Sequence, residues 1–568
     1  MQKICKKCAN NFEITEDDLK FYDKVSPVFD GVKYPVPKPS LCPDCRRQRR
    51  LAWQNILKLY ARKCDYSGKN ILSFISPDKK FKVFDNDVWW SDSWDPLDYG
   101  MEFDFNKTFF EQFGELMSKV PLINLSRRPS SDENSDFTNY TLDNKNCYLI
   151  FHANNDQDCY YGFGVKYCSD AVDILNTFSS EIIYECIDCE NCYNLFFSQD
   201  CENCSDSMFL NDCLGCKNCI ACHGLQNAQY HVFNKKVTEQ EYKLIEKEIR
   251  SGSYKTLKDW NGKFRKFLLT LPHRAVVEKW NENCSGDHIY RCKNVKESFD
   301  VKDTQDSKFC WRVFNGPNSD CYDIDQFGMC SEKVYECSAV GVNTTNILFG
   351  MNCREQISDL IYCFLCYFSN HLFGCMGLRR KQYCVLNKQY SKEEYEKLIP
   401  KIITHMQKTG EWGEFFPASL SLFGYNETIA YEHFPLLKEN ALSAGFNWSD
   451  YASPPPVANK VITKKEMQKL PDNIQDINED ILDSALTCEI SGKLYKIIKP
   501  ELSFYKKHNL PLPKRCPDQR HADRMALRCP RKLWERNCFK CKKTIQTTYA
   551  PDRPEIVYCE ECYLKEVY

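Results

Sequence analysis

The sequence predicts a mixed, mainly β protein in which a cysteine-rich β-solenoid of two lobes is flanked by two copies of one cysteine-knuckle module. Three observations predict this class. The two ends of the chain match each other at a constant offset, a twelve-residue unit repeats through the middle, and the repeat region itself recurs later in the chain. With 568 residues, 43% of them hydrophobic, the chain is long enough to bury several cores.

These patterns divide the chain into six segments. They are an N-terminal module (1–100), a connecting segment (101–140), a first solenoid lobe with a closing helix (141–252), a second such lobe (280–410), a linker region with a proline-rich stretch (411–483) and a C-terminal module (484–568) that duplicates the N-terminal one.

The duplication of the ends is visible residue by residue. Cys5 and Cys488 are 483 residues apart, and the same offset superimposes Phe21 and Tyr22 on Phe504 and Tyr505. After a shorter loop the offset becomes 474, which aligns "CPDCRRQRR" (42–50) with "CPDQRHADR" (516–524) and "KLYARKC" (58–64) with "KLWERNC" (532–538). Matches at constant offset over about 80 residues indicate a duplicated module.

Each module has positions for two metal sites, and each retains the ligands of only one. In the first copy, Cys5 and Cys8 form one knuckle and Cys42 and Cys45 a second, which opens a predicted helix. Four thiolates in this treble-clef arrangement predict a tetrahedral zinc site. The corresponding positions of the second copy are Cys488, Ser491, Cys516 and Gln519.

At the other site the situation is reversed. The second copy has the zinc-ribbon spacing of Cys538, Cys541, Cys559 and Cys562, whereas the first copy has Cys64, Ser67, Asp85 and Val88. We therefore expect two Zn²⁺ ions per chain, one at each end. A closed all-thiolate site offers no open coordination position and activates no water, so both ions are expected to be structural. The alternative is that these eight cysteines are merely buried thiols.

The middle of the chain repeats with a period of twelve, in "CENCYNLFFSQD" (189–200), "CENCSDSMFLND" (201–212) and "CLGCKNCIACHG" (213–224). Short apolar stretches separated by Asn, Asp and Gly indicate brief strands and turns stacked in a β-solenoid. The array is itself duplicated: residues 180–186 recur at 331–337, an offset of 151, and residues 222–249 recur at 375–402, an offset of 153. Both copies end in a predicted helix with a capping box, at Thr238 and Ser391.

Three interpretations of the array cysteines are open. Equivalent positions of a solenoid stack at strand spacing, so a ladder of cysteines can fill a narrow interior. Alternatively, Cys189, Cys192, Cys201 and Cys204 gather a metal ion or an iron–sulfur centre. Stacked disulfides are the third interpretation, and they fit a reducing compartment poorly.

Charge is uneven along the chain. The net charge is −2, yet residues 484–568 contain 18 Lys and Arg against 10 Asp and Glu, a net of +8. Zinc knuckles with projecting arginines are suited to phosphate contact, which makes Arg46, Arg47, Arg49, Arg50, Arg520 and Arg524 candidate nucleic-acid ligands. The alternative is a solvated helix face paired with local acids.

Four stretches carry a resemblance to known proteins: "CPDCRRQRR", "LFGYNETIAYEHFPL", "GFNWSDY" and "RPEIVYCEECYLKEVY". They resemble a group of zinc-ribbon proteins of small-genome, uncultivated bacteria, and the likeness covers most of the chain. The resemblance implies no activity, because none is established for that group. In its pattern the positions of Gln519 and Cys529 are more usually Cys and Asn.

Together these features predict a non-enzymatic, zinc-binding scaffold or adaptor that binds nucleic acid or a ribonucleoprotein. A protein-only interaction scaffold is the second hypothesis. A β-helix enzyme acting on carbohydrate is the third, with Asp323 and Asp325 on one strand face as its only candidates. The N-terminal stretch has no apolar core of signal-peptide length and the longest apolar run is too short to span a bilayer, so we expect a soluble, cytoplasmic protein with no membrane partner.

Overall fold

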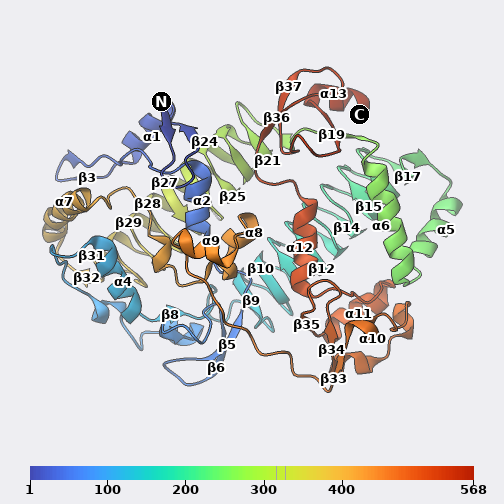
Figure 1. The fold of residues 1–568 in the computed structure, drawn as a ribbon, viewed down its shortest axis with the longest axis horizontal. Helices are drawn as coiled ribbons and strands as arrows, with labels where there is room; N and C mark the ends of the chain where they lie inside the picture. The colour runs from blue at the N-terminus through green and yellow to red at the C-terminus, as the bar shows by residue number, and fades with distance from the viewer. Residues whose placement is uncertain (315, 327, 568) are drawn as a thin grey trace. The chain divides into compact units, whose positions relative to one another are not determined.

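The computed structural model describes residues 1–314, 316–326 and 328–567, which form two compact units (Figure 1). Unit 1 comprises Met1–Leu125, Val276–Tyr451 and Arg531–Leu533, and unit 2 comprises Ser126–Ala275, Ala452–Pro530 and Trp534–Tyr568. The N-terminal module therefore belongs to the same unit as the second repeat region. The C-terminal module belongs to the unit of the first repeat region, so each unit is assembled from segments far apart in the sequence.

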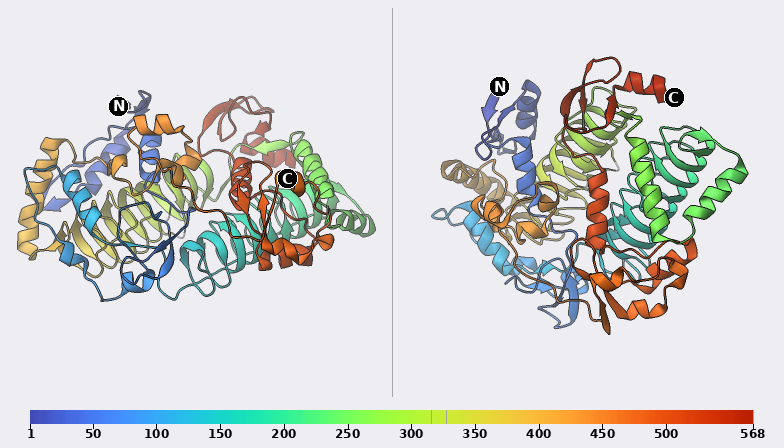
Figure 2. Two further views of the ribbon diagram at one scale, coloured as in Figure 1. Left: turned by 60° about the horizontal axis from the view of Figure 1, so that its bottom comes forward. Right: turned by 45° about the vertical axis from the view of Figure 1, so that its right-hand side comes forward.

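A ten-stranded sheet is the largest part of unit 2. Its strands succeed one another in chain order, and all neighbours are parallel except β17 and β18 (Figure 2). The strands are β9 (Thr138–Leu142), β10 (Tyr148–Asn154), β11 (Gln157–Phe163), β12 (Ser169–Leu175), β13 (Glu181–Tyr184), β14 (Tyr193–Phe196), β15 (Ser205–Asn211), β16 (Lys217–His223), β17 (Gln229–Val232) and β18 (Lys235–Lys236).

Residues paired between the parallel strands of this sheet are twelve residues apart along the chain. Tyr148 pairs with Tyr160 and Ser169 pairs with Glu181, and isolated bridges outside the strands, such as Lys145 with Gln157, keep the same spacing. The twelve-residue repeat of the sequence is thus the spacing between neighbouring strands. The large parallel sheet confirms the mainly β class.

Unit 1 contains a thirteen-stranded sheet in which β21 pairs with β23 and β22 with β24, whereas from β26 onward the strands succeed one another in chain order; all pairs are parallel except β31 with β32. Between β26 and β29 the spacing becomes thirteen, as in the pairs Cys321 with Val334 and Ile347 with Leu360, and it returns to twelve from Leu360 to Leu372. Two added residues between β27 and β29 explain why the offset between the two repeat regions grows from 151 to 153. The strands are β20 (Glu278–Lys279), β21 (Gly286–Tyr290), β22 (Lys293–Lys296), β23 (Ser298–Lys302), β24 (Thr304–Lys308), β25 (Trp311–Val313), β26 (Asn318–Asp325), β27 (Ser331–Ser338), β28 (Thr344–Leu348), β29 (Ile357–Ile361), β30 (Asn370–Phe373), β31 (Gln382–Val385) and β32 (Lys388–Gln389).

The cysteines of both sheets are buried together with Ile, Leu and Val side chains. Each thiol donates to backbone carbonyls: Cys159 Sγ lies 3.3 Å from Gln157 O and 3.5 Å from Cys168 O, and Cys204 Sγ lies 3.5 Å from Glu202 O and 3.4 Å from Cys213 O. A small side chain with a weak donor therefore fills the interior and gives the inward carbonyls a partner.

The two terminal modules contain the same elements in the same order. In unit 1 these are β1 (Gln2–Ile4), β2 (Asn11–Glu13), α1 (Glu16–Val25), α2 (Pro43–Leu51), β5 (Tyr60–Lys63), β6 (Asn70–Ser73), β7 (Val83–Phe84) and α3 (Asn86–Trp90). Their counterparts are β34 (Ser484–Thr487), β35 (Leu494–Tyr495), α11 (Lys499–His508), α12 (Pro517–Leu527), β36 (Trp534–Asn537), β37 (Thr544–Thr547), β38 (Ile556–Tyr558) and α13 (Glu560–Val567). The first copy has one addition, the hairpin of β3 (Val28–Phe29) and β4 (Val32–Lys33).

Each sheet is followed by a helix at the predicted place. Capping boxes at Thr238 and Ser391 open α5 (Glu239–Ile249) and α7 (Lys392–Thr409), which confirms both predicted helix starts. The remaining elements are α4 (Phe109–Lys119), β8 (Leu122–Ile123), α8 (Ile429–His433) and α9 (Lys438–Ser443) in unit 1, and α6 (Tyr254–Leu268), β19 (Pro272–Arg274), β33 (Lys460–Ile462) and α10 (Lys464–Met467) in unit 2. Among the described residues, no helix has both the length and the apolar character needed to cross a membrane.

Candidate metal centres and the arginine clusters beside them

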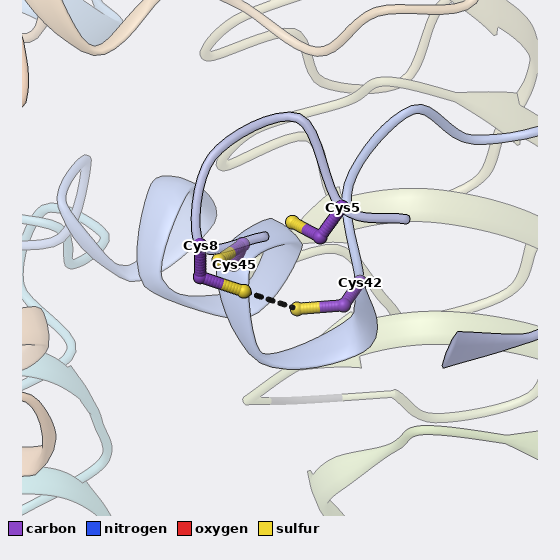
Figure 3. A group of neighbouring side chains, drawn as sticks. All are labelled: Cys5, Cys8, Cys42 and Cys45. Carbon is purple, nitrogen blue, oxygen red and sulfur yellow. Dashed lines mark hydrogen bonds between the residues drawn. The ribbon is translucent and has the colours of Figure 1, made fainter. Parts of the chain in front are cut away.

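The first candidate centre consists of Cys5, Cys8, Cys42 and Cys45 (Figure 3). The turn between β1 and β2 carries the first two thiols, and Cys42 caps α2, whose first turn carries Cys45. The four sulfur atoms all lie within 4.8 Å of one another, and Cys8 Sγ is 3.7 Å from Cys42 Sγ. Four Zn–S bonds of about 2.3 Å in a tetrahedron require sulfur atoms about 3.8 Å apart, so this cluster has the geometry of a metal site.

The second candidate centre consists of Cys538, Cys541, Cys559 and Cys562. The turn between β36 and β37 carries the first pair, and the start of α13 carries the second. Cys541 Sγ lies 3.7 Å from Cys559 Sγ, and the Cys559 amide donates to Cys538 Sγ at 3.3 Å. The two clusters show that both ends of the chain can hold a metal ion, with the residues that the sequence predicted.

The four knuckles that begin at Cys5, Cys64, Cys488 and Cys538 share the same turn, including the two that have lost ligands. The fourth residue after the first cysteine has a positive φ in each: Ala9 (59°), Gly68 (72°), Gly492 (72°) and Lys542 (64°). In each, the amide of that residue donates to the carbonyl of the cysteine, at 2.9–3.1 Å. The duplicated turn is therefore retained where the metal ligands are not.

The two sites that have lost cysteine ligands contain hydrogen bonds in place of a metal ion's bonds. Ser491 Oγ lies 3.6 Å from Cys516 Sγ, and Gln519 Nε2 donates to Asp523 Oδ1 at 2.9 Å. In the first module, Ser67 Oγ donates to Asp85 Oδ2 at 3.0 Å, and the amides of both residues donate to Cys64 Sγ. Neither set is among the metal-competent clusters of the described residues.

The array cysteines Cys189, Cys192, Cys201 and Cys204 are likewise absent from those clusters within the described part of the chain. Their thiols donate to backbone carbonyls instead. The structure thus favours the interior ladder over a metal or iron–sulfur centre.

The arginines after the first centre are buried in unit 1. Helix α2 packs against β26 and β27, and Arg46 donates to Asp323 Oδ2 from both Nε (3.0 Å) and Nη2 (2.8 Å). Arg50 Nε donates to Asp325 Oδ2 at 2.5 Å. The cluster also includes Arg47, whose Nε lies 3.4 Å from Asp325 Oδ1, and Arg49, whose Nη2 donates to Glu336 Oε2 at 2.9 Å.

Unit 2 repeats this arrangement with the second copy of the module. Helix α12 packs against β12, where Arg520 and Arg524 both donate to Asp173, the latter from Nη1 at 2.8 Å. Arg520 Nη2 also donates to Glu501 Oε1 at 3.2 Å. Since Arg46 and Arg50 correspond to Arg520 and Arg524 at an offset of 474, and Asp173 lies 150 residues before Asp323, one docking geometry has been duplicated.

The assignment of these arginines to phosphate contact needs correction. Arg46, Arg47, Arg50, Arg520 and Arg524 are each at most 3% exposed, and the side chain of Arg49 is 13% exposed. The carboxylates that hold them come from strands and helices distant in sequence, so the guanidinium groups face the interior of their own unit. They form neither a phosphate-binding surface nor a solvated helix face.

The pKa shifts of Arg46 and Arg520 agree with permanent ion pairs. Burial by itself lowers the pKa of a guanidinium, but Asp323 and Asp173 outweigh it and raise the pKa of Arg46 and Arg520 well above the ordinary value. Burial raises the pKa of Glu336, and the surrounding arginines oppose that rise. The Arg46–Asp323 and Arg520–Asp173 pairs therefore keep these two guanidinium groups in the charged form.

The candidate catalytic pair is part of the same cluster. Asp323 and Asp325 are fully buried beneath α2, with Arg46, Arg47 and Arg50 as partners. No substrate reaches carboxylates held in this way, so these two aspartates do not support an enzyme. Sequence reasoning missed their role, together with that of Asp173; the signal was the recurrence of Asp173 as Asp323, near the offset that relates the two repeat regions.

Comparisons with known proteins give no family. No family model matches the sequence, and no curated protein matches it. A solved structure named as an acetyltransferase of Desulfovibrio desulfuricans has 8% sequence identity and a TM-score of 0.09, over 43% of this chain and 63% of that one. A TM-score this low carries no argument about fold or activity.

Proposed function

We propose that the protein is a non-enzymatic scaffold in which two metal-stabilised modules each clamp one β-solenoid lobe and leave other faces free for a protein partner. One observation carries this proposal. The arginines of α2 and α12 form buried ion pairs with carboxylates of the sheet in their own unit. A module whose arginines form ion pairs with the sheet acts as a structural clamp on that sheet.

The proposed metal is Zn²⁺ at both centres. Four thiolates at tetrahedral spacing are a typical ligand set for structural zinc, and each centre is closed by its four sulfurs. The residues that would hold the ions are Cys5, Cys8, Cys42 and Cys45 in unit 1 and Cys538, Cys541, Cys559 and Cys562 in unit 2. Such an ion fixes the turn that starts a helix and leaves no position for substrate.

The proposed lobes are solenoids with twelve or thirteen residues in most coils, and with eleven or fourteen at some pairs near the start of the second lobe. Three features support this: parallel partners at that spacing, rows of bridges outside the strands at the same spacing, and a positive φ at about every third residue, as at Asp188, Asn191, Asn194 and Phe197. A regular left-handed conformation turns the backbone at each corner of a coil.

A protein partner is favoured over nucleic acid. The nucleic-acid hypothesis depended on six arginines that are now paired with carboxylates, whereas the scaffold hypothesis does not need them. Binding of RNA or DNA through other cations stays a prediction, and its test is salt-dependent retention of the intact protein on a mixed polynucleotide.

Hydrogen exchange with and without metal tests the clamp. Helix α2 begins at the metal knuckle Cys42–Cys45, whereas α12 begins at the depleted position of Cys516 and Gln519 and docks in the same way. Removal of metal from the intact protein by a chelator under reducing conditions should accelerate exchange in α2 by about tenfold or more, and should leave α12 nearly unchanged.

The comparison of the two helices decides the outcome. Loss of protection in α2 alone supports a local metal clamp. Unchanged exchange in both helices after complete metal removal, or equal loss in both, would contradict it.

A further inference from the structure

A cavity of about 550 Å³ opens in unit 1 between the N-terminal module and the sheet. Its wall is the hairpin of β3 and β4, with Phe29 and Asp30 at the cavity, and its floor is the row of strands β27 to β31. The volume is that of a typical site for a small molecule or a single side chain of a partner.

The hairpin wall is specific to the first module. The offset between the copies falls from 483 to 474 across this loop, so the second module lacks nine residues here. The hairpin contributes Val28, Phe29, Asp30 and Gly31 to the cavity. Duplication supplied the docking geometry twice, but only unit 1 has the segment that encloses this space.

The floor is a ladder of side chains at equivalent positions on five strands: Lys333, Asn346, Asp359, His371 and Tyr383. Asn346 Nδ2 donates to Asp359 Oδ1 at 2.9 Å, and the His371 ring stacks on Tyr383 at 5.0 Å. The side chains of Asp359 and His371 are 38% and 40% exposed, so both can meet a ligand.

Unit 2 has the same ladder at Ile182, Asn194, Asp206, Asn218 and Tyr230, and there it holds a guanidinium. Asn194 Nδ2 donates to Asp206 Oδ1 at 3.0 Å, as in unit 1. Arg250 then donates from Nη2 to Asn194 Oδ1 at 3.2 Å and from Nε to Glu246 Oε1 of its own helix at 3.2 Å, with its guanidinium 4.5 Å from the centre of the Phe196 ring.

Unit 1 has no such arginine of its own at this position. The offset of 153 places Ile403 of α7 where α5 has Arg250, and Ile403 is fully buried. Unit 1 thus has no guanidinium of its own for Asn346, the counterpart of Asn194, and Asn346 lines the cavity instead.

Charge around the cavity fits a cation. Lys24 and Lys333 have carboxylate partners outside its lining, Asp320 at 2.6 Å and Glu332 at 3.5 Å. The lining has three carboxylates, Asp30, Asp359 and Glu396, against its two lysines, and the aromatic rings of Phe29 and Tyr383. Asp359 lies 3.8 Å from the His371 ring, and Glu396 lies 3.8 Å from Lys392 of its own helix. Carboxylates and aromatic faces together are the usual environment of a bound guanidinium.

We propose that this cavity binds the arginine side chain of a partner protein, with Asp359 and Asn346 as the polar contacts and Tyr383 as the aromatic one. The inference deepens the proposed scaffold role and rests on it, since it identifies the chemistry of the partner. Free guanidinium compounds share this chemistry, and the test separates them from a peptide.

Calorimetric titration of the metal-loaded, full-length protein with acetyl-Gly-Arg-Gly-amide tests the proposal. The same peptide with citrulline, which keeps the shape of arginine without its charge, should bind at least about tenfold more weakly, because a charge-assisted hydrogen bond is lost. Agmatine should bind more weakly than the peptide if the peptide backbone contributes contacts, and equally if the guanidinium alone is recognised.

Variants locate the site. Asp359→Asn should weaken the arginine peptide about tenfold, whereas Asp206→Asn, the same change in the occupied ladder of unit 2, should not affect it. The proposal is overturned by equal binding of the arginine and citrulline peptides, by binding that is unaffected in Asp359→Asn, by equal weakening in Asp206→Asn, or by no heat of binding at about 10 mM peptide. Peptide binding and metal-dependent protection of α2 are separate measurements, so failure of one leaves the other proposal standing.

Discussion

Asp173 accepts hydrogen bonds from both arginines of α12, which makes it the most informative residue to perturb in unit 2. The variant Asp173→Asn keeps the size of the side chain and removes its charge. Asp173 is fully buried, and the side chains of Arg520 and Arg524 are only 4% and 1% exposed, so water cannot solvate the guanidinium groups, and the variant leaves them only Glu501 and Glu185 as charged partners. Removal of one partner from a buried ion pair costs about 3–5 kcal/mol.

For a unit of this size, a loss of about 4 kcal/mol corresponds to a fall in the melting temperature of roughly 10 °C. The measurement is differential scanning calorimetry of the metal-loaded protein. Asp170→Asn is the matched control, because Asp170 lies on the same strand, β12, and is only partly buried. A shift in Asp173→Asn no larger than in Asp170→Asn, or below about 1 kcal/mol, would refute the view that these ion pairs hold the module on the sheet.

Three further predictions follow from the same structure. The double variant Ser491→Cys/Gln519→Cys restores four thiols on a knuckle whose backbone is intact, so the metal content measured by atomic emission should rise by one ion per chain, whereas Ser491→Cys alone should leave it unchanged. Burial raises the pKa of Asp156 to about 8, so the folded state keeps a proton that the unfolded state releases above pH 3.8. The free energy of unfolding should therefore fall by about 1.4 kcal/mol per pH unit between pH 4 and pH 8. Asp156→Asn should remove this dependence in urea unfolding, and an unchanged slope would contradict the assignment. Burial lowers the pKa of His273 to about 4, with a further contribution from His223, so below pH 6.5 the unfolded state binds a proton that the folded state does not bind. The stabilisation is fully present above pH 6.5, and the free energy of unfolding falls by about 3 kcal/mol from there to pH 4. His273→Asn should reduce that loss in the same unfolding assay.

Much of the architecture is readable in the sequence because it is repeated. The constant offsets predicted the duplicated module, and the same elements occur in both copies down to the turn after Cys5, Cys64, Cys488 and Cys538. The cysteine spacing predicted both four-thiol clusters, since a knuckle is a local structure set by a few residues. The capping boxes at Thr238 and Ser391 are local in the same sense.

The partners of the arginines were beyond the reach of the sequence. Arg46 and Asp323 are 277 residues apart, and Arg520 and Asp173 are 347 residues apart. A cluster of arginines has the same appearance in a sequence whether it faces solvent, a phosphate or a buried carboxylate. Nothing local indicated that each module docks on the sheet from the other half of the chain. The spacing of thirteen residues between paired strands from β27 to β29 was hidden for a similar reason: it appears only as a drift of the offset from 151 to 153.

The metal count tests the central claim most directly. Native mass spectrometry of anaerobically purified protein should show two zinc ions per chain, one in each of the variants Cys45→Ser and Cys541→Ser, and none in the double variant. Zero or one ion in the wild type, a third ion held by the array cysteines, or iron with labile sulfide would contradict a protein closed at each end by one structural zinc.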